Sequence, residues 1–325
     1  MKEVLAFFFK SLTVLMVASF CFTATAQNFP SKPIKIIVPF GPGGVADLTA
    51  RIVAQKMGSK IGQSVVVENR PGAGGVVAGD LVAKADPDGH TLLLMSNGTA
   101  ISATLFQKLP YDTLKDFEAI STLGFFDIGI VVNQSSPFQS LKDLITFSKS
   151  NPGKINIASI NIGSTQNLAA ELFRLQAGLN LQVVPFNGTP AVITAIRGEQ
   201  VDAAVEIMGP LVPQIKSKSI RLLAVSGAKR SAFFPDIPTA NEMGVKDYAL
   251  SSWNALAAPG KTPNQIILAL NQAVVDSLND PEVKSKLQDL FIEPQSSSPK
   301  EMKTLLENDV KRWASIIEKA NVPKQ

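Results

Sequence analysis

Short runs of β-branched and aliphatic residues alternate with amphipathic stretches along the chain from residue 32 onward. The first unit predicts a strand at residues 34–40, a glycine-rich loop at 41–44 and a helix over about 46–59. A second unit follows, with a strand at 64–68, a loop at 70–75 and a helix over 76–85. Further apolar runs predict strands at residues 91–96, 128–132, 155–159, 181–185, 201–206 and 220–226. This recurring unit predicts an α/β fold.

The arrangement of these elements suggests how the strands pair. Because helices separate most of them, we expect parallel pairing through right-handed crossovers, with strands covered on both faces. The C-terminal third is predicted to be helical, since Thr262-Pro263-Asn264-Gln265 and Ser298-Pro299-Lys300-Glu301 each offer a cap, a first-turn proline and a reciprocal Gln or Glu. The last helix, over about 299–320, carries a core-packing apolar face formed by Met302, Leu305, Leu306, Val310, Trp313, Ile316 and Ile317.

No long proline- or serine-rich linker divides the chain, so a domain boundary is expected within ordinary strands or short segments. The favoured positions are near residues 125–129 and 250–253. This prediction gives one lobe from residues 27–128 and 252–325, with a second lobe, 129–251, inserted into it. Two such crossings would act as a hinge between the lobes.

The first 26 residues have the pattern of a secretory signal peptide. Lys2 and Lys10 precede an apolar run at 11–22, which leads to Ala24-Thr25-Ala26, and we predict cleavage after Ala26. The run is shorter than the ~20 residues that a membrane-spanning helix needs. The only cysteine, Cys21, lies in this segment, so the mature secreted chain would have no disulfide, zinc-thiolate site or cysteine nucleophile.

Composition and charge exclude several classes of function. The chain of 325 residues is 45% hydrophobic and 18% charged, which is typical of a globular protein. Its net charge of +4 comes from scattered lysines and arginines without a basic stripe, which disfavours nucleic-acid binding. The single histidine, His90, lies in a predicted turn, and no Gly-x-Ser-x-Gly motif is present, so we expect neither an enzyme nor a metal or cofactor site.

Four predicted strands end in loops rich in Gly, Ser, Thr or Asn that then open helices, at residues 41–44, 96–99, 161–166 and 187–190. The first amides of a helix carry unpaired N–H donors and a partial positive charge, which suit carboxylate or phosphate oxygens. Ligands of open α/β sheets bind beyond the carboxyl ends of the strands. The loops therefore predict an anion-binding cleft, although a tight turn remains the alternative for any one loop. No Walker or dinucleotide motif supports phosphate.

Several spaced motifs resemble one known family. Ser31-Lys32-Pro33-Ile34 leads into Val38-Pro39-Phe40-Gly41-Pro42-Gly43-Gly44, and Glu68-Asn69-Arg70-Pro71-Gly72-Ala73-Gly74-Gly75 follows. These motifs are similar to the opening of Bug-type proteins, the substrate-binding subunits of tripartite tricarboxylate transporters, and the resemblance covers essentially the whole mature chain. It implies a two-lobed periplasmic-binding-protein fold (type II, Venus flytrap) with a mainly parallel sheet in each lobe, and we expect the mature, periplasmic protein to be a monomer. The family implies capture of a small carboxylic acid and its delivery to the large and small membrane subunits.

The resemblance also implies a set of ligand-binding residues: Phe40, Gly43, Gly44, Ser96, Asn97 and Thr99 from the first lobe, and Ser164, Thr165, Asn187, Gly188 and Thr189 from the second. Ser164 and Thr165 each supply a hydroxyl and an amide at a helix start. Simple helix capping is the alternative for either. The sequence departs from the family where relatives usually carry histidine, here Asn167, and where many carry aspartate, here Thr194.

Glu206 stands after a predicted strand where relatives often place aspartate. It could face the cleft and select a ligand amino or hydroxyl group, or it could be a surface or lobe-contact carboxylate. Two other functions stay open at this point. The bound protein could signal to a membrane receptor such as a sensor kinase, or it could be a periplasmic enzyme.

Overall fold

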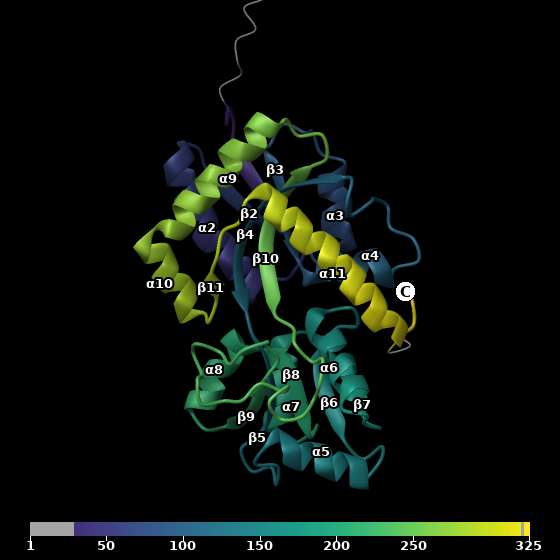
Figure 1. Ribbon diagram of the computed structural model, residues 1–325. Coiled ribbons are helices and arrows are strands. Elements are labelled where there is room, and N and C mark those ends of the chain that lie inside the picture. The colour runs from purple at the N-terminus through teal and green to yellow at the C-terminus, as the bar shows by residue number, and fades with distance from the viewer. Residues whose placement is uncertain (1–28, 320–321) are drawn as a thin grey trace, which may run out of the picture. The chain divides into compact units, whose positions relative to one another are not determined.

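Two β-sheets, each flanked by helices, organise the chain from Lys32 to Gln325 (Figure 1). The structure is a computed structural model that describes residues 29–319 and 322–325. The predicted signal peptide, its cleavage site and Cys21 lie outside the described residues.

The first sheet has six strands in the order β11-β4-β10-β3-β1-β2. Their bounds are β1 Ile34–Val38, β2 Val65–Asn69, β3 Thr91–Ser96, β4 Phe117–Phe126, β10 Ser252–Pro259 and β11 Glu293–Pro294. Its helices are α2 Val45–Ile61, α3 Val76–Ala83 after the short η1 Ala73–Gly75, α4 Asn97–Leu105, α9 Asn264–Asn279, α10 Pro281–Asp289 and α11 Pro299–Lys319.

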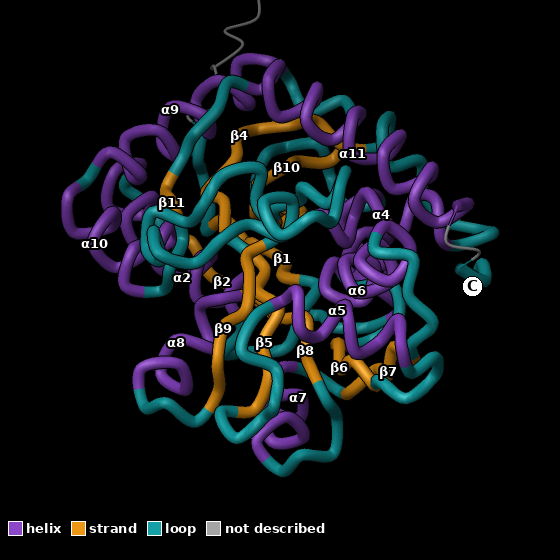
Figure 2. The backbone as a smooth tube through the Cα atoms, turned by 60° about the horizontal axis from the view of Figure 1, so that its bottom comes forward, coloured by secondary structure: helices purple, strands orange, loops and turns teal. Residues whose placement is uncertain are grey.

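The second sheet has five strands in the order β7-β6-β8-β5-β9. Their bounds are β5 Ile128–Asn133, β6 Asn156–Ile160, β7 Gln182–Phe186, β8 Ala203–Ile207 and β9 Ile220–Val225. Its helices are α5 Leu141–Ser150, α6 Thr165–Gln176, α7 Thr189–Arg197 and α8 Met208–Lys216. All eight strands predicted from the sequence are present, whereas β4, β10 and β11 were not predicted. In Figure 2, strands β4, β10 and β11 of one sheet lie towards the top, and strands β5 to β9 of the other lie towards the bottom.

Four of the nine strand pairs are parallel, as expected, and five are antiparallel, including the pair of the short β11 with β4. Strands β1, β2 and β3 pair in parallel, as do β6, β7 and β8, but β10 is antiparallel to β3 and β4, and β5 is antiparallel to β8 and β9. The reason is connectivity. Strands β5 and β10 each enter their sheet from the other sheet and begin beside the carboxyl ends of β8 and β3, so they run in the opposite direction.

The chain crosses between the two sheets twice, at Asp127 and in the segment 226–251 between β9 and β10. We propose that the boundaries of the two lobes lie at these crossings. Phe291, which follows α10, packs its ring against Phe233 and Phe234 of the second crossing, with centroid distances of 5.0 and 5.5 Å. The Lys216 ammonium at the end of α8 lies 5.7 Å from the same ring. These contacts tie the two lobes together beside the crossings.

The C-terminal helix α11 packs its predicted face into the core. Met302, Leu306, Trp313, Ile316 and Ile317 are buried, which confirms the prediction from helical spacing. The capping box is also confirmed, because Ser298 N–H donates to Glu301 Oε2 at 2.8 Å and Glu301 N–H donates to Ser298 Oγ at 3.2 Å.

The equivalent prediction for α9 is wrong. This helix begins at Asn264 after Pro263, without a side-chain cap. The Thr262 hydroxyl instead donates to the Pro259 carbonyl at the end of β10, at 2.7 Å, so it is not available to cap the helix.

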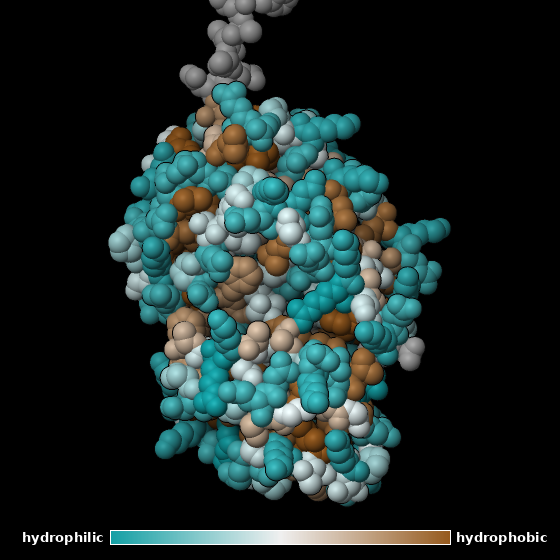
Figure 3. Space-filling model, in the orientation of Figure 1, coloured by the Kyte–Doolittle hydropathy of each residue, from teal (hydrophilic) through white to brown (hydrophobic). Residues whose placement is uncertain are grey.

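In the part of the chain that the structure describes, no helix is both long and apolar enough to cross a membrane. On the face shown in Figure 3, apolar side chains form small patches separated by polar ones.

Candidate functional site

In the first sheet, the direction in which the chain adds strands reverses at β1. From β1 the chain moves to β2 on one side and then to β3 on the other, so the carboxyl ends of β1 and β3 border a topological switch point. Such points are where open α/β sheets bind ligands. The first-lobe residues that were predicted to bind the ligand lie here: Phe40 to Gly44 follow β1, and Ser96 to Thr99 follow β3.

The second sheet repeats this arrangement around β6. The chain moves from β6 to β7 on one side and then to β8 on the other, so β6 and β8 border a second switch point. Ser164 and Thr165 follow β6, residues 187–189 follow β7, and Glu206 lies at the end of β8. The topology therefore gathers the predicted second-lobe residues at one edge of the sheet.

These two edges meet. A Cβ atom on Gly163, just before α6, would lie 2.6 Å from Leu105 Cδ2 at the end of α4. A Cβ atom on Gly209, in the first turn of α8, would lie 3.6 Å from Cγ2 of Val45, the first residue of α2. Glycine is favoured at position 163 for two reasons: a side chain would clash with Leu105, and the φ of 82° also disfavours one. The carboxyl ends of the two sheets thus face each other across close contacts.

An internal carboxylate already occupies the start of α2. The Gly43 amide donates to Asp47 Oδ2 at 2.9 Å, and Asn69 Nδ2 and Arg51 Nε donate to Asp47 Oδ1 at 2.8 and 3.0 Å. Burial would raise the pKa of Asp47, but the hydrogen bonds from Arg51, Gly43 and Asn69 outweigh it and lower the pKa. The Gly43 amide, predicted to bind the ligand, is therefore engaged within the protein.

The start of α4 is closed by its own side chains. Ser96 Oγ accepts from the Gly98 amide at 3.1 Å, and the Ser96 amide donates to Thr99 Oγ1 at 3.3 Å, forming a capping box. The Phe40 ring lies beside this turn, since a Cβ atom on Gly98 would be 3.7 Å from Phe40 Cζ. The structure thus brings Phe40, Ser96 and Thr99 together, with both polar side chains engaged in capping.

Asn97 is part of a buried network that links α4 to β10 and α11. Its Oδ1 accepts from the Trp253 amide at 2.9 Å and from Ser252 Oγ at 3.0 Å, and its Nδ2 donates to Asp309 Oδ2 at 3.0 Å. The side chain is 2% exposed. Because its donors and acceptor are used inside the protein, we leave the Asn97 side chain out of the proposed site.

The start of α6 offers unused amides. Ser164 is the N-cap, and its Oγ accepts from the Asn167 amide at 3.1 Å and donates to the Ile160 carbonyl at 3.2 Å. In the described chain, the amides of Thr165 and Gln166, the first two residues of the helix, have no hydrogen-bond partner. Asn167 holds the preceding turn, since its Oδ1 accepts from the Gly163 amide.

Replacing Ser164 with alanine is expected to lower the free energy of unfolding by about 1 kcal/mol, because the first turn of α6 loses its side-chain cap. Urea unfolding of Ser164→Ala and of the conservative Ser164→Thr would test this. Equal stability of the alanine variant and the parent would contradict the capping role.

The start of α7 is more open to solvent. Asn187 is exposed, Gly188 is the N-cap with a φ of 90°, and Thr189 begins the helix. Pro190 at the second position has no amide hydrogen, so Thr189 supplies the only free amide that the first two residues of this helix could offer. Thr194, one of the departures from the family pattern, is exposed, and its hydroxyl donates to the Pro190 carbonyl of its own helix.

Glu206 lies beneath the first turns of α6 and α7 and is 0% exposed. Its Oε1 accepts from Gln166 Nε2 at 2.7 Å and from the Ile207 amide at 2.8 Å, whereas Oε2 is buried without a partner among the described residues. Burial raises the pKa of Glu206 to about 7, although Gln166, the Ile207 amide and the nearby Thr189 hydroxyl act to lower it. No hydrogen bond of normal geometry joins Thr189 to Oε2.

Because Glu206 is 0% exposed, it is not the surface carboxylate that was one of the alternatives for this residue. Strand β8 pairs with β6 only as far as Ala204, two residues before Glu206. Gln166, which the sequence did not single out, covers it from α6. The position of Gln166 in a helix first turn was the available signal, but its partner 40 residues away was not visible from the sequence.

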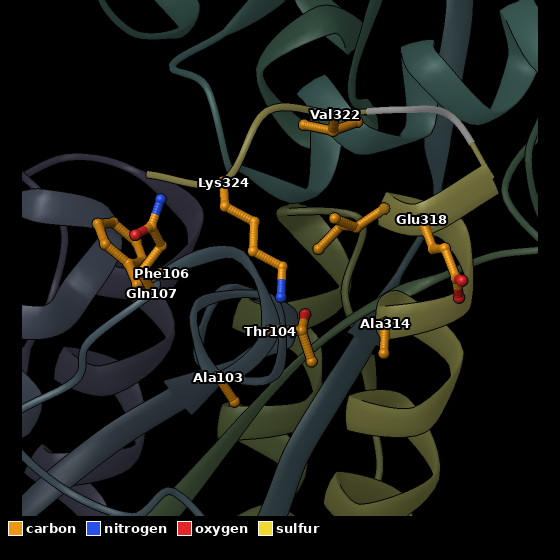
Figure 4. A pocket seen from close by; sticks show the side chains of 9 residues that line it. Ala103, Thr104, Phe106, Gln107, Ala314, Glu318, Val322 and Lys324 are labelled. Carbon is orange, nitrogen blue, oxygen red and sulfur yellow. The ribbon is translucent and has the colours of Figure 1, made fainter.

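A hollow of about 760 Å³ lies elsewhere, between the end of α4, α11 and the C-terminal segment (Figure 4). Its lining includes Thr104, Phe106, Glu318 and Lys324. None of the predicted ligand-binding residues borders it, and its shape alone indicates no chemistry. We therefore place the candidate site at the two switch points and not here.

The sequence profile of the tripartite tricarboxylate transporter family receptor matches residues 49–322. The chain belongs to this receptor family. It is 34% identical over 295 residues to the protein BugT of Bordetella pertussis, covering 90% of both chains. The family resemblance stated from the sequence motifs is thus confirmed.

Two solved structures are similar to this receptor over nearly its whole length. MatC from Rhodopseudomonas palustris with bound malate is 30% identical, with a TM-score of 0.81, covering 89% of this chain and 100% of that one. Rpa4515 of R. palustris with adipate is 30% identical, with a TM-score of 0.84, covering 90% and 98%. These similarities and the two sheets confirm the two-lobed periplasmic-binding-protein fold of the receptor.

Proposed function

We propose that this chain is a periplasmic solute-binding protein that captures a small carboxylate by closure of its two lobes and delivers it to membrane transporter subunits. The observation that carries the proposal is the start of α6, where two unpartnered amides lie at a switch point that faces the other lobe. Helix N-terminal amides bind carboxylates without a nearby arginine. Binding and delivery require no chemical change of the ligand.

Two relatives support the class of ligand. Malate and adipate, bound by the two R. palustris proteins, are both dicarboxylates. We propose that one ligand carboxylate lies on the amides of Thr165 and Gln166, with Thr189 and exposed Asn187 beside it. Across the lobe contact, Phe40, Gly44, Ser96 and Thr99 form the facing wall. Glu206, beneath the first turns of α6 and α7, would affect ligand binding from there.

Lobe closure would use the two crossings as a hinge. Only Asp127 and the segment 226–251 join the lobes along the chain, so few dihedral angles need to change when the lobes move. A ligand that contacts both edges favours the closed state by its additional contacts.

Calorimetric titration of the mature protein with malate, adipate, amino acids and aromatic acids tests the proposed function. We expect at least one carboxylate to bind with one site per chain. If none of these acids binds to folded protein, the proposal of carboxylate capture is wrong.

Replacing Thr165 with proline is expected to weaken carboxylate binding roughly 10- to 150-fold, which corresponds to about 1.5–3 kcal/mol for a hydrogen bond to a charged group. Proline fits the first position of a helix and removes the amide hydrogen there, together with the threonine hydroxyl. The preceding residue, Ser164, already has the extended backbone that proline requires, with φ −74° and ψ 159°.

Two further variants make this result specific. Thr165→Val removes the hydroxyl and keeps the amide, so a smaller loss of affinity than in Thr165→Pro assigns the difference to the amide. Asn264→Pro makes the same change at the exposed first position of α9, remote from the site, and should bind normally. Unchanged affinity in folded Thr165→Pro would move the site away from α6.

A further inference from the structure

The environment of Glu206 carries an inference that rests on the proposed function. This carboxyl group lies at the switch point between β6 and β8, and its neighbours come from the first turns of two helices, Gln166 on α6 and Thr189 on α7. Both helices present their positive ends to the same place. The proposed ligand carboxylate and the Glu206 carboxyl group therefore share one small region.

The two oxygens of Glu206 differ. Oε1 accepts hydrogen bonds from Gln166 Nε2 at 2.7 Å and from the Ile207 amide at 2.8 Å, so it is fully used as an acceptor. Oε2 is buried and unpartnered in the described part of the chain. An ionised carboxylate with one bare, buried oxygen is unfavourable, and a proton on Oε2 removes that charge.

Two negative charges a few ångströms apart in a buried environment cannot both persist at low energy. We propose that Glu206 allows this half of the site to accept a ligand carboxylate only together with a proton, which Glu206 takes up as the ligand binds. The ligand does not need to touch Glu206, because the coupling acts through space over the depth of one helix turn.

Among the residues that the structure describes, no charged group offsets the negative charge of an ionised Glu206. The charged residues on the elements around Glu206 are few, and none of them contributes to its pKa: Glu171 and Arg174, which pair with each other on α6, Arg197 on α7, Lys216 on α8 and Asp127 before β5. Burial raises the pKa of Glu206 to about 7 before any ligand arrives. A bound ligand carboxylate raises this pKa further, so the number of protons on Glu206 changes on binding near neutral pH.

Calorimetric titration with malate and with adipate at pH 7.5, in phosphate and in Tris, measures the proton exchange directly. Both acids are fully ionised at this pH, so neither supplies the proton. We expect the wild-type protein to take up roughly half a proton per ligand, and Glu206→Gln to take up none while still binding. Affinity of the wild type should also weaken up to about tenfold from pH 6 to pH 9, and that of Glu206→Gln should not.

Glu293→Gln is the matched control, because it makes the same chemical change at an exposed position of β11, outside the proposed site and the two crossings. This variant should keep the wild-type proton uptake. Binding without proton exchange, equal uptake by Glu206→Gln, or proton release on binding would each overturn the inference, and release would indicate that an ionised Glu206 accepts a ligand donor. If neither acid nor any other carboxylate binds, the proposed function itself fails, and this inference with it.

Discussion

For Glu206→Gln, the difference between the free energy of unfolding of the variant and that of wild type is expected to increase by about 2–3 kcal/mol in favour of the variant between pH 5 and pH 8. Burial raises the folded-state pKa of this carboxyl group to about 7 from an ordinary value of 4.5. Its favourable contribution is therefore fully present below about 4.5 and is lost as the pH rises through 7. Glutamine has the same shape and no charge, so the variant lacks this loss.

Urea unfolding of ligand-free protein at several pH values measures the effect. Glu293→Gln makes the same chemical change at an exposed position of β11, and its difference from wild type should not depend on pH in this way. A pH profile of Glu206→Gln parallel to that of wild type would mean that Glu206 is ionised in the folded protein without penalty. It would also remove the physical basis for proton uptake on binding.

The second large effect is expected at Asn97, where alanine should lower the free energy of unfolding by about 3–5 kcal/mol. The substitution leaves the Trp253 amide, the Ser252 hydroxyl and Asp309 Oδ2 each without one partner in a buried region. Asp309 is the most sensitive of these. Burial raises its pKa, and Trp253 Nε1, at 2.7 Å, would be its main remaining donor.

Chemical denaturation of Asn97→Ala tests this, with Asn279→Ala at the exposed end of α9 as the control. Carboxylate affinity of the fraction that remains folded should stay close to that of wild type. The opposite pattern, normal stability with weakened binding, would restore Asn97 to the ligand site that the sequence first indicated.

These two residues show how sequence and structure divide the account of the site. The motifs at 96–99 and 161–166 correctly predicted helix starts at strand ends, because glycine, serine and threonine have local backbone and capping preferences. They could not separate free amides from engaged ones. The Gly43 amide is taken by Asp47, and Ser96 and Thr99 cap each other, whereas the amides of Thr165 and Gln166 remain open.

Strand β10 marks a similar limit for the fold. Its sequence, Ser252 to Pro259, is rich in alanine and has no β-branched residue, so local propensity does not indicate a strand. It is nevertheless buried at every position between β3 and β4, where small side chains fit beneath the covering helices. Pairing with two neighbours, distant in sequence, decided its conformation.

The sequence by itself determined the α/β class, eight of the strands, the core face of α11 and the family, since each depends on local periodicity or on motifs read in order. Only the tertiary structure decided which strands run antiparallel, that Asn97 is a core residue and that Glu206 lies buried with one oxygen bare. The physical reason is that hydrogen-bond partners and desolvation come from residues far apart in the chain. Asn97 and Trp253 are 156 positions apart, and only folding brings them into contact.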